Sequence, residues 1–158
     1  MSYSKLLEYS KRVAKEVDKF MLDEVLVGEP ENLYQASTHL IRAGGKRLRP
    51  TLLILSSRLV GGNEEIAIPA AAAIEILHNF TLVHDDVMDM DEFRRGVPTV
   101  HKIWGIPVAI IAGDLLFSKA FEALLKLTDR NVSYDRIVKS AEILAKTAST
   151  IAEGQAMD

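Results

Sequence analysis

The sequence predicts an all-α fold, and three observations support that prediction. Apolar residues recur every three or four positions along most of the 158-residue chain, which is the spacing of one helix face. Glycine and proline residues cluster at a few points, such as residues 28–30 and 61–63, and divide the chain into helix-length segments. No segment alternates polar and apolar residues cleanly enough to predict a strand.

The expected elements follow in order from these breaks. An apolar stripe over residues 4–27 predicts a first helix, which a Gly-Glu-Pro sequence ends. A second helix is expected over residues 31–42, before a glycine pair. The third is expected over residues 50–60, because Pro50 suits a first helical turn.

A long fourth helix is expected over residues 64–88. Its most apolar part, residues 66–83, contains a proline, a glutamate, a histidine and an asparagine, so it predicts a buried core helix and no transmembrane segment. The remaining expected segments are a polar loop over residues 92–98, a short segment over 99–104, and helices over 106–127 and from 133 onward.

Composition limits the classes of partner and the location. Apolar residues make up 48% of the chain and charged residues 26%, as in an ordinary globular domain. The net charge of −3 offers no overall basic field for nucleic acid or an anionic membrane. Without cysteine or a signal peptide in the sequence, we expect a cytoplasmic protein. The last helix reaches Asp158 without a capping residue, so residues 1–158 are expected to be the N-terminal portion of one longer domain.

The acidic run HDDVMDMDE at the end of the expected fourth helix is the most informative motif. Asp85 and Asp89 are one turn apart and share a face, with His78 two turns earlier on the same stripe. Like charges at that spacing, near the negative end of the helix dipole, destabilise a helix unless a cation neutralises them. Hard oxygen ligands suit Mg²⁺, which takes one or two carboxylates and leaves room for phosphate. The alternative is a solvated acidic helix end.

Two basic motifs accompany the acidic run. Arg94 and Arg95 follow it directly, and arginine forks match phosphate geometry. The motif GGKRLRP places Lys46, Arg47 and Arg49 after a glycine turn, where backbone N–H groups help to hold an anion. An ordinary basic loop is the alternative for this motif, which lacks the Walker A spacing. Two basic sites and one acidic metal site together suggest two diphosphate substrates.

Three motifs together resemble those of the trans-type isoprenyl diphosphate synthase family, in order and in spacing. They are GGKRLRP, HNFTLVHDDVMDMDEFRRGVPTVH and the terminal GQAMD, and the resemblance covers essentially all of residues 35–158. It implies an α-helical bundle with a deep central cavity, and a homodimer. It also implies an Mg²⁺-dependent prenyltransferase that joins isopentenyl diphosphate to an allylic diphosphate.

The resemblance implies a role for each matching residue. Four residues are expected to hold the diphosphate of isopentenyl diphosphate, namely Lys46, Arg49, His78 and Arg95. The metal is expected on Asp85 and Asp89, supported by Asp86 and Asp91. Arg94 is expected to contact the allylic diphosphate, and Gln155 resembles a glutamine near that substrate. The expected catalytic residues are therefore Asp85, Asp86, Asp89 and Arg94.

The implied reaction needs no nucleophilic side chain. The allylic C–O bond ionises to a carbocation while Mg²⁺ and arginines stabilise the departing diphosphate. The isopentenyl double bond then attacks, and a proton is lost. The sequence agrees, because it has no cysteine and no convincing Ser-His-Asp set. A carbocation also requires an apolar pocket without water, whose wall the long fourth helix can supply.

Phe80 and Thr81 are the expected determinants of product length. Phe80 stands five residues before Asp85, about 7 Å deeper at helical rise, and the motif DDVMD has no two-residue insertion. That combination resembles archaeal-type geranylgeranyl diphosphate synthases, so a geranylgeranyl product is expected. Helical geometry alone places Phe80 about 140° around the axis from Asp85, so a core position for Phe80 is the alternative.

Two other classes of protein stay open at this point. Full-length family members are much longer and carry a second aspartate-rich motif, so the chain alone is expected to be inactive. A non-catalytic partner subunit that modulates a full-length synthase is one alternative, and the intact acidic and basic motifs argue against it. A class I terpene cyclase is the other, and GGKRLRP disfavours it because a cyclase has no second diphosphate to hold.

Overall fold

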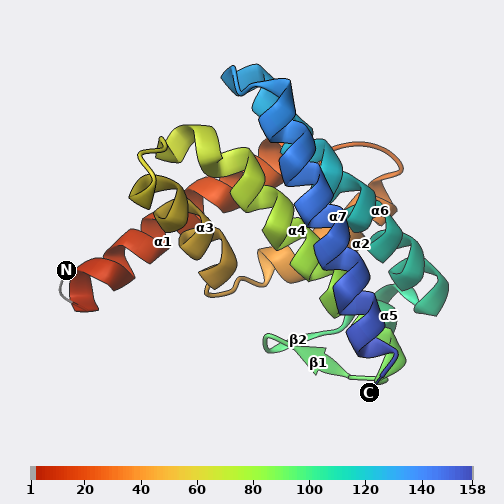
Figure 1. The fold of residues 1–158 in the computed structure, drawn as a ribbon. Helices are drawn as coiled ribbons and strands as arrows, with labels where there is room; N and C mark the ends of the chain where they lie inside the picture. The colour runs from red at the N-terminus through yellow and green to blue at the C-terminus, as the bar shows by residue number, and fades with distance from the viewer. Residues whose placement is uncertain (1–2, 158) are drawn as a thin grey trace.

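The fold is a bundle of helices, of which the computed structural model describes residues 3–157 (Figure 1). The α-helices are α1 (Tyr3–Phe20), α2 (Glu31–Arg42), α3 (Leu48–Leu59), α4 (Glu64–Met88), α5 (Val100–Trp104), α6 (Ile106–Leu125) and α7 (Tyr134–Gln155). Two shorter turns are the π-helical η1 (Met21–Val25) and the 3-10 turn η2 (Lys126–Arg130). The all-α prediction is confirmed.

Helix α4 forms the centre of the bundle and packs most extensively against α6 and then α3. The alanine run over residues 71–73 is at most 1% exposed, because small side chains let the neighbouring helices approach closely. Asn63 caps the helix: its Oδ1 accepts hydrogen bonds from the N–H groups of Glu65 at 2.8 Å and Ile66 at 3.3 Å. A helix fixed at its start and buried along its length can hold the side chains of its last turns in place.

The apolar character of α4 reflects this burial. Among the described helices, α4 alone is long and apolar enough to cross a membrane, by length and composition. Its apolar window has a mean hydropathy of 1.6, and 61% of that window is buried inside the bundle. The structure therefore agrees with the expectation of a core helix.

The first expected helix is interrupted near its end. Helix α1 ends at Phe20, and the backbone widens into η1, where the N–H of Leu26 donates to Met21 O at 2.8 Å. Met21 and Val25 stay buried in the turn. The prediction of one continuous helix over residues 4–27 was wrong here, because a π turn keeps the same apolar side chains inside.

Helix α3 begins two residues earlier than predicted. Arg47 precedes it with a left-handed φ of 46°, and its carbonyl accepts a hydrogen bond from the N–H of Thr51 at 3.1 Å. Pro50 still lies in the first turn, where an N–H group would have no partner inside the helix. The proline therefore marks the turn correctly, and the left-handed residue before it sets the start.

A small hairpin occupies the segment expected to be a loop. Strands β1 (Phe93–Arg94) and β2 (Val97–Pro98) pair antiparallel. The two turn residues, Arg95 at φ 55° and Gly96 at φ 79°, both have the positive φ of a tight hairpin turn. The prediction of no strands was wrong at this point, because two-residue strands are too short to give an alternating pattern.

Candidate active site

The last turns of α4 carry the acidic cluster. Asp85 is partly exposed, and Asp86 faces inward and is 0% exposed. Asp89 is the exposed C-cap residue, and its N–H donates to Asp85 O at 2.8 Å. The carboxylates lie at the negative end of the α4 dipole, so the arrangement is unfavourable unless positive charge compensates it.

Arg94 supplies compensating charge from β1. Its Nε donates to Asp86 Oδ1 at 2.6 Å, and its Nη2 donates to Asp91 Oδ2 at 3.0 Å and Asp85 Oδ2 at 3.4 Å. Burial raises the pKa of Asp86, and the hydrogen bond from Arg94 opposes that rise. The other oxygen of Asp86 is buried and accepts no hydrogen bond from the described residues. Asp86 thus fixes Arg94 beside the cluster, and Asp85 and Asp89 stay accessible.

The accessible carboxylates fit Mg²⁺ as part of its coordination shell, with other ligands filling the remaining positions. Within residues 3–157, no group of three or more His, Cys, Asp or Glu side chains is arranged to hold a metal by itself. Mg²⁺ does not require such a cage, because it commonly binds one or two carboxylates and fills its other positions with water and phosphate oxygens. Asp85 and Asp89 offer two hard oxygen donors of that kind. Asp86 and Asp91 pair more closely with Arg94, at 2.6 and 3.0 Å, than Asp85 does at 3.4 Å.

A cavity of about 390 Å³ between α4 and α7 lies beside this cluster. It brings together predicted site residues from three helices: Arg49 of α3, His78 and Asp85 of α4, and Gln155 of α7. Gln155 Nε2 donates to Asp85 Oδ1 at 3.4 Å, so residues 70 positions apart meet at the acidic cluster. The other lining residues are mostly apolar: Ile74, Leu77, Thr81, Leu82, Thr147 and Ile151.

His78 is a neutral group in this cavity at ordinary pH. Burial, together with the positive charge around it, lowers the pKa of His78 from 6.5 to about 4. The charges come from Arg49, Arg95, Arg47 and Arg94. A neutral imidazole can still donate one hydrogen bond to an anionic ligand.

Replacing His78 with glutamine is expected to reduce the loss of stability in mild acid. The unfolded chain protonates this histidine near pH 6.5 and the folded chain only near pH 4, so its contribution is present above pH 6.5 and is lost as the pH falls through that window. Urea unfolding of both chains at about pH 7 and about pH 5 should show the wild type losing about 1 kcal/mol more than H78Q, a value discounted for partial exposure. Equal losses in the two chains would contradict the lowered pKa.

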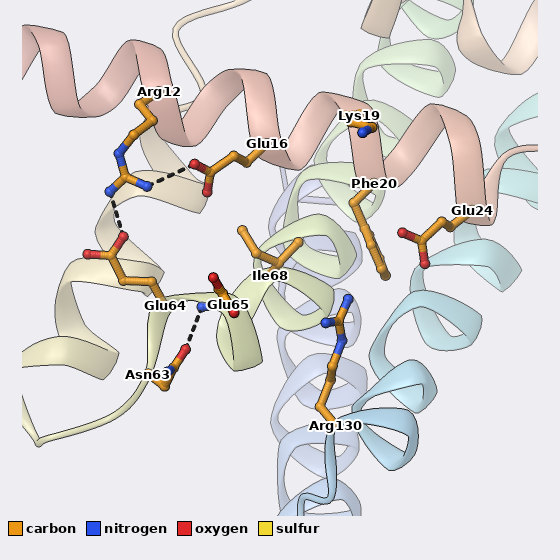
Figure 2. Close-up of a pocket in the computed structure, with 10 residues that line it drawn as sticks. All are labelled: Arg12, Glu16, Lys19, Phe20, Glu24, Asn63, Glu64, Glu65, Ile68 and Arg130. Carbon is orange, nitrogen blue, oxygen red and sulfur yellow. Dashed lines mark hydrogen bonds and ion pairs between the residues drawn. The ribbon is translucent and has the colours of Figure 1, made fainter.

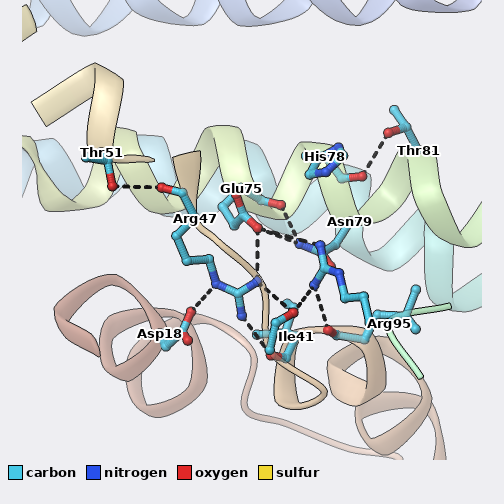
Figure 3. Close-up of polar contacts among 11 residues, drawn as sticks. Asp18, Ile41, Arg47, Thr51, Glu75, His78, Asn79, Thr81 and Arg95 are labelled. Carbon is cyan, nitrogen blue, oxygen red and sulfur yellow. Dashed lines mark hydrogen bonds and ion pairs between the residues drawn. The ribbon is translucent and has the colours of Figure 1, made fainter. Parts of the chain in front are cut away.

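The loop between α2 and α3 carries the second basic motif (Figure 3). Lys46 is exposed and lines a different cavity, of about 570 Å³, between α1 and α3. Arg47 is buried, and its Nε donates to Asp18 Oδ1 at 2.6 Å. Arg95 reaches the same loop and donates from Nη1 to Gly44 O at 2.6 Å. The structure therefore does not place Lys46 in the cavity that holds Arg49 and His78.

The adjacent arginines of the RRG motif serve different parts of the site. Arg94 turns to the carboxylates of α4, and Arg95 turns to the carbonyl groups of Leu40 and Gly44. The two neighbouring guanidinium groups therefore do not point to one place in this structure. Their expected contacts with diphosphate stay predictions.

Phe80 and Thr81 line a second cavity between α4 and α7, of about 350 Å³. Phe80 makes edge-to-face contacts with His84 and with Phe117 of α6, at centroid distances of 4.8 and 5.3 Å. Thr81 also lines the 390 Å³ cavity, and Gln155 lines both. Phe80 therefore has both of the positions considered for it, since it packs against α6 and borders a cavity. Its role in product length stays a prediction.

A cavity of about 580 Å³ at the opposite end of α4 holds none of the predicted site residues (Figure 2). Among its charged side chains, Arg12 pairs with Glu16 and Glu64. Arg12 donates to Glu16 at 2.8 Å and to Glu64 at 2.6 Å, and Arg58 pairs with Glu64 at 2.8 Å. Such partly exposed ion pairs lie at the surface of the bundle and contribute little to its stability.

Sequence reasoning missed three polar residues beneath the basic loop, of which Glu75 and Asn79 are buried and Asp18 is partly exposed. Asp18, Glu75 and Asn79 contact Arg47 or Arg95, yet they lie in ordinary helical segments. The only available signal was their polarity within the apolar stretch of residues 66–83, which applies to Glu75 and Asn79. Asp18 gave no signal, since acidic residues are common on exposed helix faces.

The fold and site define a helical-bundle protein in which one cavity is lined both by Asp85 of the acidic helix end and by Arg49 of the basic motif. The chain belongs to the polyprenyl synthetase family, whose model matches residues 30–158. The geranylgeranyl diphosphate synthase of Methanosarcina mazei is 53% identical over 138 residues, which are 87% of this chain and 42% of that protein.

Two solved structures agree with this assignment. The geranylgeranyl pyrophosphate synthetase of Pyrococcus horikoshii matches with a TM-score of 0.92 and 46% identity, over 99% of this chain and 47% of that one. A polyprenyl synthase of Caulobacter crescentus, solved with calcium and isoprenyl diphosphate, matches with a TM-score of 0.84 and 35% identity, over 98% of this chain and 44% of that one. The chain thus spans about half the length of the relatives that it matches.

Proposed function

We propose that the whole protein is an Mg²⁺-dependent prenyltransferase. It would condense isopentenyl diphosphate with dimethylallyl, geranyl or farnesyl diphosphate and form a short-chain all-trans prenyl diphosphate. The observation that carries this proposal is the cavity where Arg49, His78, Asp85 and Gln155 converge from three helices. The names of the relatives support it, and so does the divalent cation with isoprenyl diphosphate in the Caulobacter crescentus structure.

The residues of the chain divide the proposed chemistry between them. Bound Mg²⁺ would neutralise the allylic diphosphate as it departs. Asp85 and Asp89 would bind the Mg²⁺ ion. Arg94, which Asp86 holds in place, would add positive charge beside it. Arg49 and His78 face the same cavity, where they can bind the diphosphate of the second substrate.

The apolar lining serves the reactive cation. Ile74, Leu77 and Leu82 surround the polar residues of the 390 Å³ cavity and limit access of water to an allylic carbocation. The product we propose is geranylgeranyl diphosphate, with Phe80 and Thr81 at the wall that limits its length. We further propose a cytoplasmic homodimer. The apolar side chains exposed on α6, at Ile106, Ile110, Ile111, Phe117 and Leu125, support pairing of two chains.

We expect the 158-residue chain to bind an allylic diphosphate without extending it. Its metal-binding carboxylates come from one helix end, so they hold Mg²⁺ from one side only. Calorimetry with geranyl diphosphate should show binding in Mg²⁺ and little binding in EDTA. A radiolabel assay with isopentenyl diphosphate should show no product from the chain alone, and product after fusion to the remaining half of the Pyrococcus horikoshii relative.

The outcomes separate the proposed enzyme from the partner-subunit alternative. Absence of Mg²⁺-dependent binding would refute the enzymatic proposal. If the chain bound no diphosphate but changed the product length of a full-length synthase, the non-catalytic partner subunit would be the better account.

A further inference from the structure

Glu75 is a buried carboxylate that the chemistry above does not use. It lies on α4 three residues before His78 and is 2% exposed. Its Oε1 accepts hydrogen bonds from Arg47 Nη1 at 3.2 Å and Asn79 Nδ2 at 3.4 Å, and Arg95 Nη2 lies 4.0 Å away (Figure 3). A single oxygen of Glu75 therefore meets the loop after α2, the helix α4 and the turn of the β1–β2 hairpin.

All three guanidinium nitrogens of Arg47 donate hydrogen bonds within the chain. Besides its contacts with Glu75 and Asp18, it donates from Nη2 to Ile41 O at 2.7 Å and from Nη1 to Gly44 O at 3.3 Å. Its side chain is 0% exposed. Although Arg47 belongs to the basic motif, it holds the loop together from inside rather than facing a ligand.

The loop over residues 43–46 rests directly on Arg47 and Arg95. Gly44 O accepts hydrogen bonds from both guanidinium groups, at 3.3 Å and 2.6 Å. A Cβ atom on Gly45 would come within 2.6 Å of Arg47 Nη1 and 3.3 Å of the Arg95 guanidinium carbon, so the loop lies too close for any side chain there. Lys46 is the next residue. Its position therefore depends on where the two guanidinium groups are held.

Glu75 and Asp18 balance the charge of these two arginines. The side chains of Arg47 and Glu75 are 0% and 3% exposed, and those of Arg95 and Asp18 are 19% and 32% exposed. Burial raises the pKa of Glu75, and the charges of Arg47 and Arg95 oppose that rise. Without the Glu75 charge, one positive charge would be buried without compensation, which is strongly unfavourable. The arginines would then shift toward water, and the loop that rests on them would move as well.

We propose that Glu75 is a positioning residue for the isopentenyl diphosphate site, because it holds Arg47 and Arg95 under the loop and so sets the place of Lys46 relative to His78. This inference rests on the function proposed above. Glu75 acts through the arginines and does not touch substrate. His78 lies one turn further along α4, and Lys46 directly precedes Arg47, whose guanidinium group Glu75 binds.

The test compares isopentenyl diphosphate binding by calorimetry in the 158-residue chain and its variants. Glu75→Gln should weaken that binding about tenfold, corresponding to one misplaced charged contact. The same variant should leave Mg²⁺-dependent geranyl diphosphate binding within about twofold of the wild type, because Asp85 and Asp89 lie more than two turns further along α4. Equal losses for both ligands would mean a general loss of structure and would overturn the proposal.

A double-mutant cycle separates positioning from general stabilisation. In a Lys46→Ala chain, the further substitution Glu75→Gln should cost less than about threefold in isopentenyl diphosphate affinity, because the group that Glu75 positions is already gone. An additive cost would contradict the proposal. Asp18→Asn removes the more exposed partner of Arg47, should weaken the same binding about threefold, and serves if Glu75→Gln does not fold.

Glu64→Gln is the matched control. Glu64 is also a glutamate of α4 paired with two arginines, Arg12 and Arg58, but it lies at the opposite end of the helix (Figure 2). Its substitution should leave both affinities unchanged. If the wild type bound no isopentenyl diphosphate, the proposed function itself would fail. If Lys46→Ala had no effect on that binding, the positioning role would fail. If Lys46→Ala weakened binding and Glu75→Gln and Asp18→Asn did not, only the positioning role would fail.

Discussion

Replacing Asp85 with asparagine is expected to weaken Mg²⁺-dependent binding of geranyl diphosphate on the order of a hundredfold. Arg94 and Gln155 donate to different oxygens of Asp85, and asparagine keeps one of these two acceptors, so most of the local structure should survive. It loses the charge that, under the proposed function, would draw the metal to the cavity. Calorimetry of the 158-residue chain in Mg²⁺ measures the change.

The sign of the effect should reverse when the metal is removed. In EDTA, Asp85 only repels a diphosphate, so D85N should bind it as well as the wild type or better. Asp23→Asn, at an exposed aspartate of η1, is the control and should change neither measurement. Weaker binding of D85N both with and without Mg²⁺ would show that Asp85 does not act through a metal.

Replacing Arg47 with methionine is expected to destabilise the fold by about 3–5 kcal/mol, because the buried Glu75 carboxylate loses its nearest charged partner and keeps only Arg95, at 4.0 Å. The carbonyl of Ile41 would also lose its hydrogen bond from Nη2, at 2.7 Å in the wild type. Urea unfolding with an unchanged dependence on denaturant measures the difference.

Arg58→Met is the matched control for this substitution. Arg58 is 49% exposed and pairs with Glu64 at 2.8 Å, so its loss should cost less than about 1 kcal/mol. A loss below about 1 kcal/mol for Arg47→Met as well would mean that Glu75 readily takes a proton or reaches water, against the burial seen here.

The helices were largely predictable because their stability comes from one-sided burial, which leaves a regular pattern in the sequence. The alanine run and the Asn63 cap of α4 are local signals of that kind. The η1 turn and the β1–β2 hairpin were not predictable in the same way. A π turn preserves the apolar stripe, and a two-residue strand is too short to show alternation.

The site residues also divide into those that local sequence spacing predicts and those that it does not. His78 and Asp85 share a face of one helix, so helical spacing alone placed them together, and the cavity between α4 and α7 confirms it. Gln155 reaches Asp85 across 70 residues, which only the family resemblance could suggest. The inward position of Arg47 could not be foreseen, because nothing in a basic motif distinguishes a buried arginine from an exposed one.

The tight turn at Arg95 and Gly96 also fixes the length of the β1–β2 hairpin. One peptide bond separates the arginine that serves the acidic end of α4 from the arginine that supports the lysine loop. Inserting or deleting a single residue there would shift one arginine away from its partners, since the two-residue turn fixes where each side chain points. Evolution can therefore vary the exposed Phe93 and Pro98 in identity far more freely than it can vary the number of residues between them.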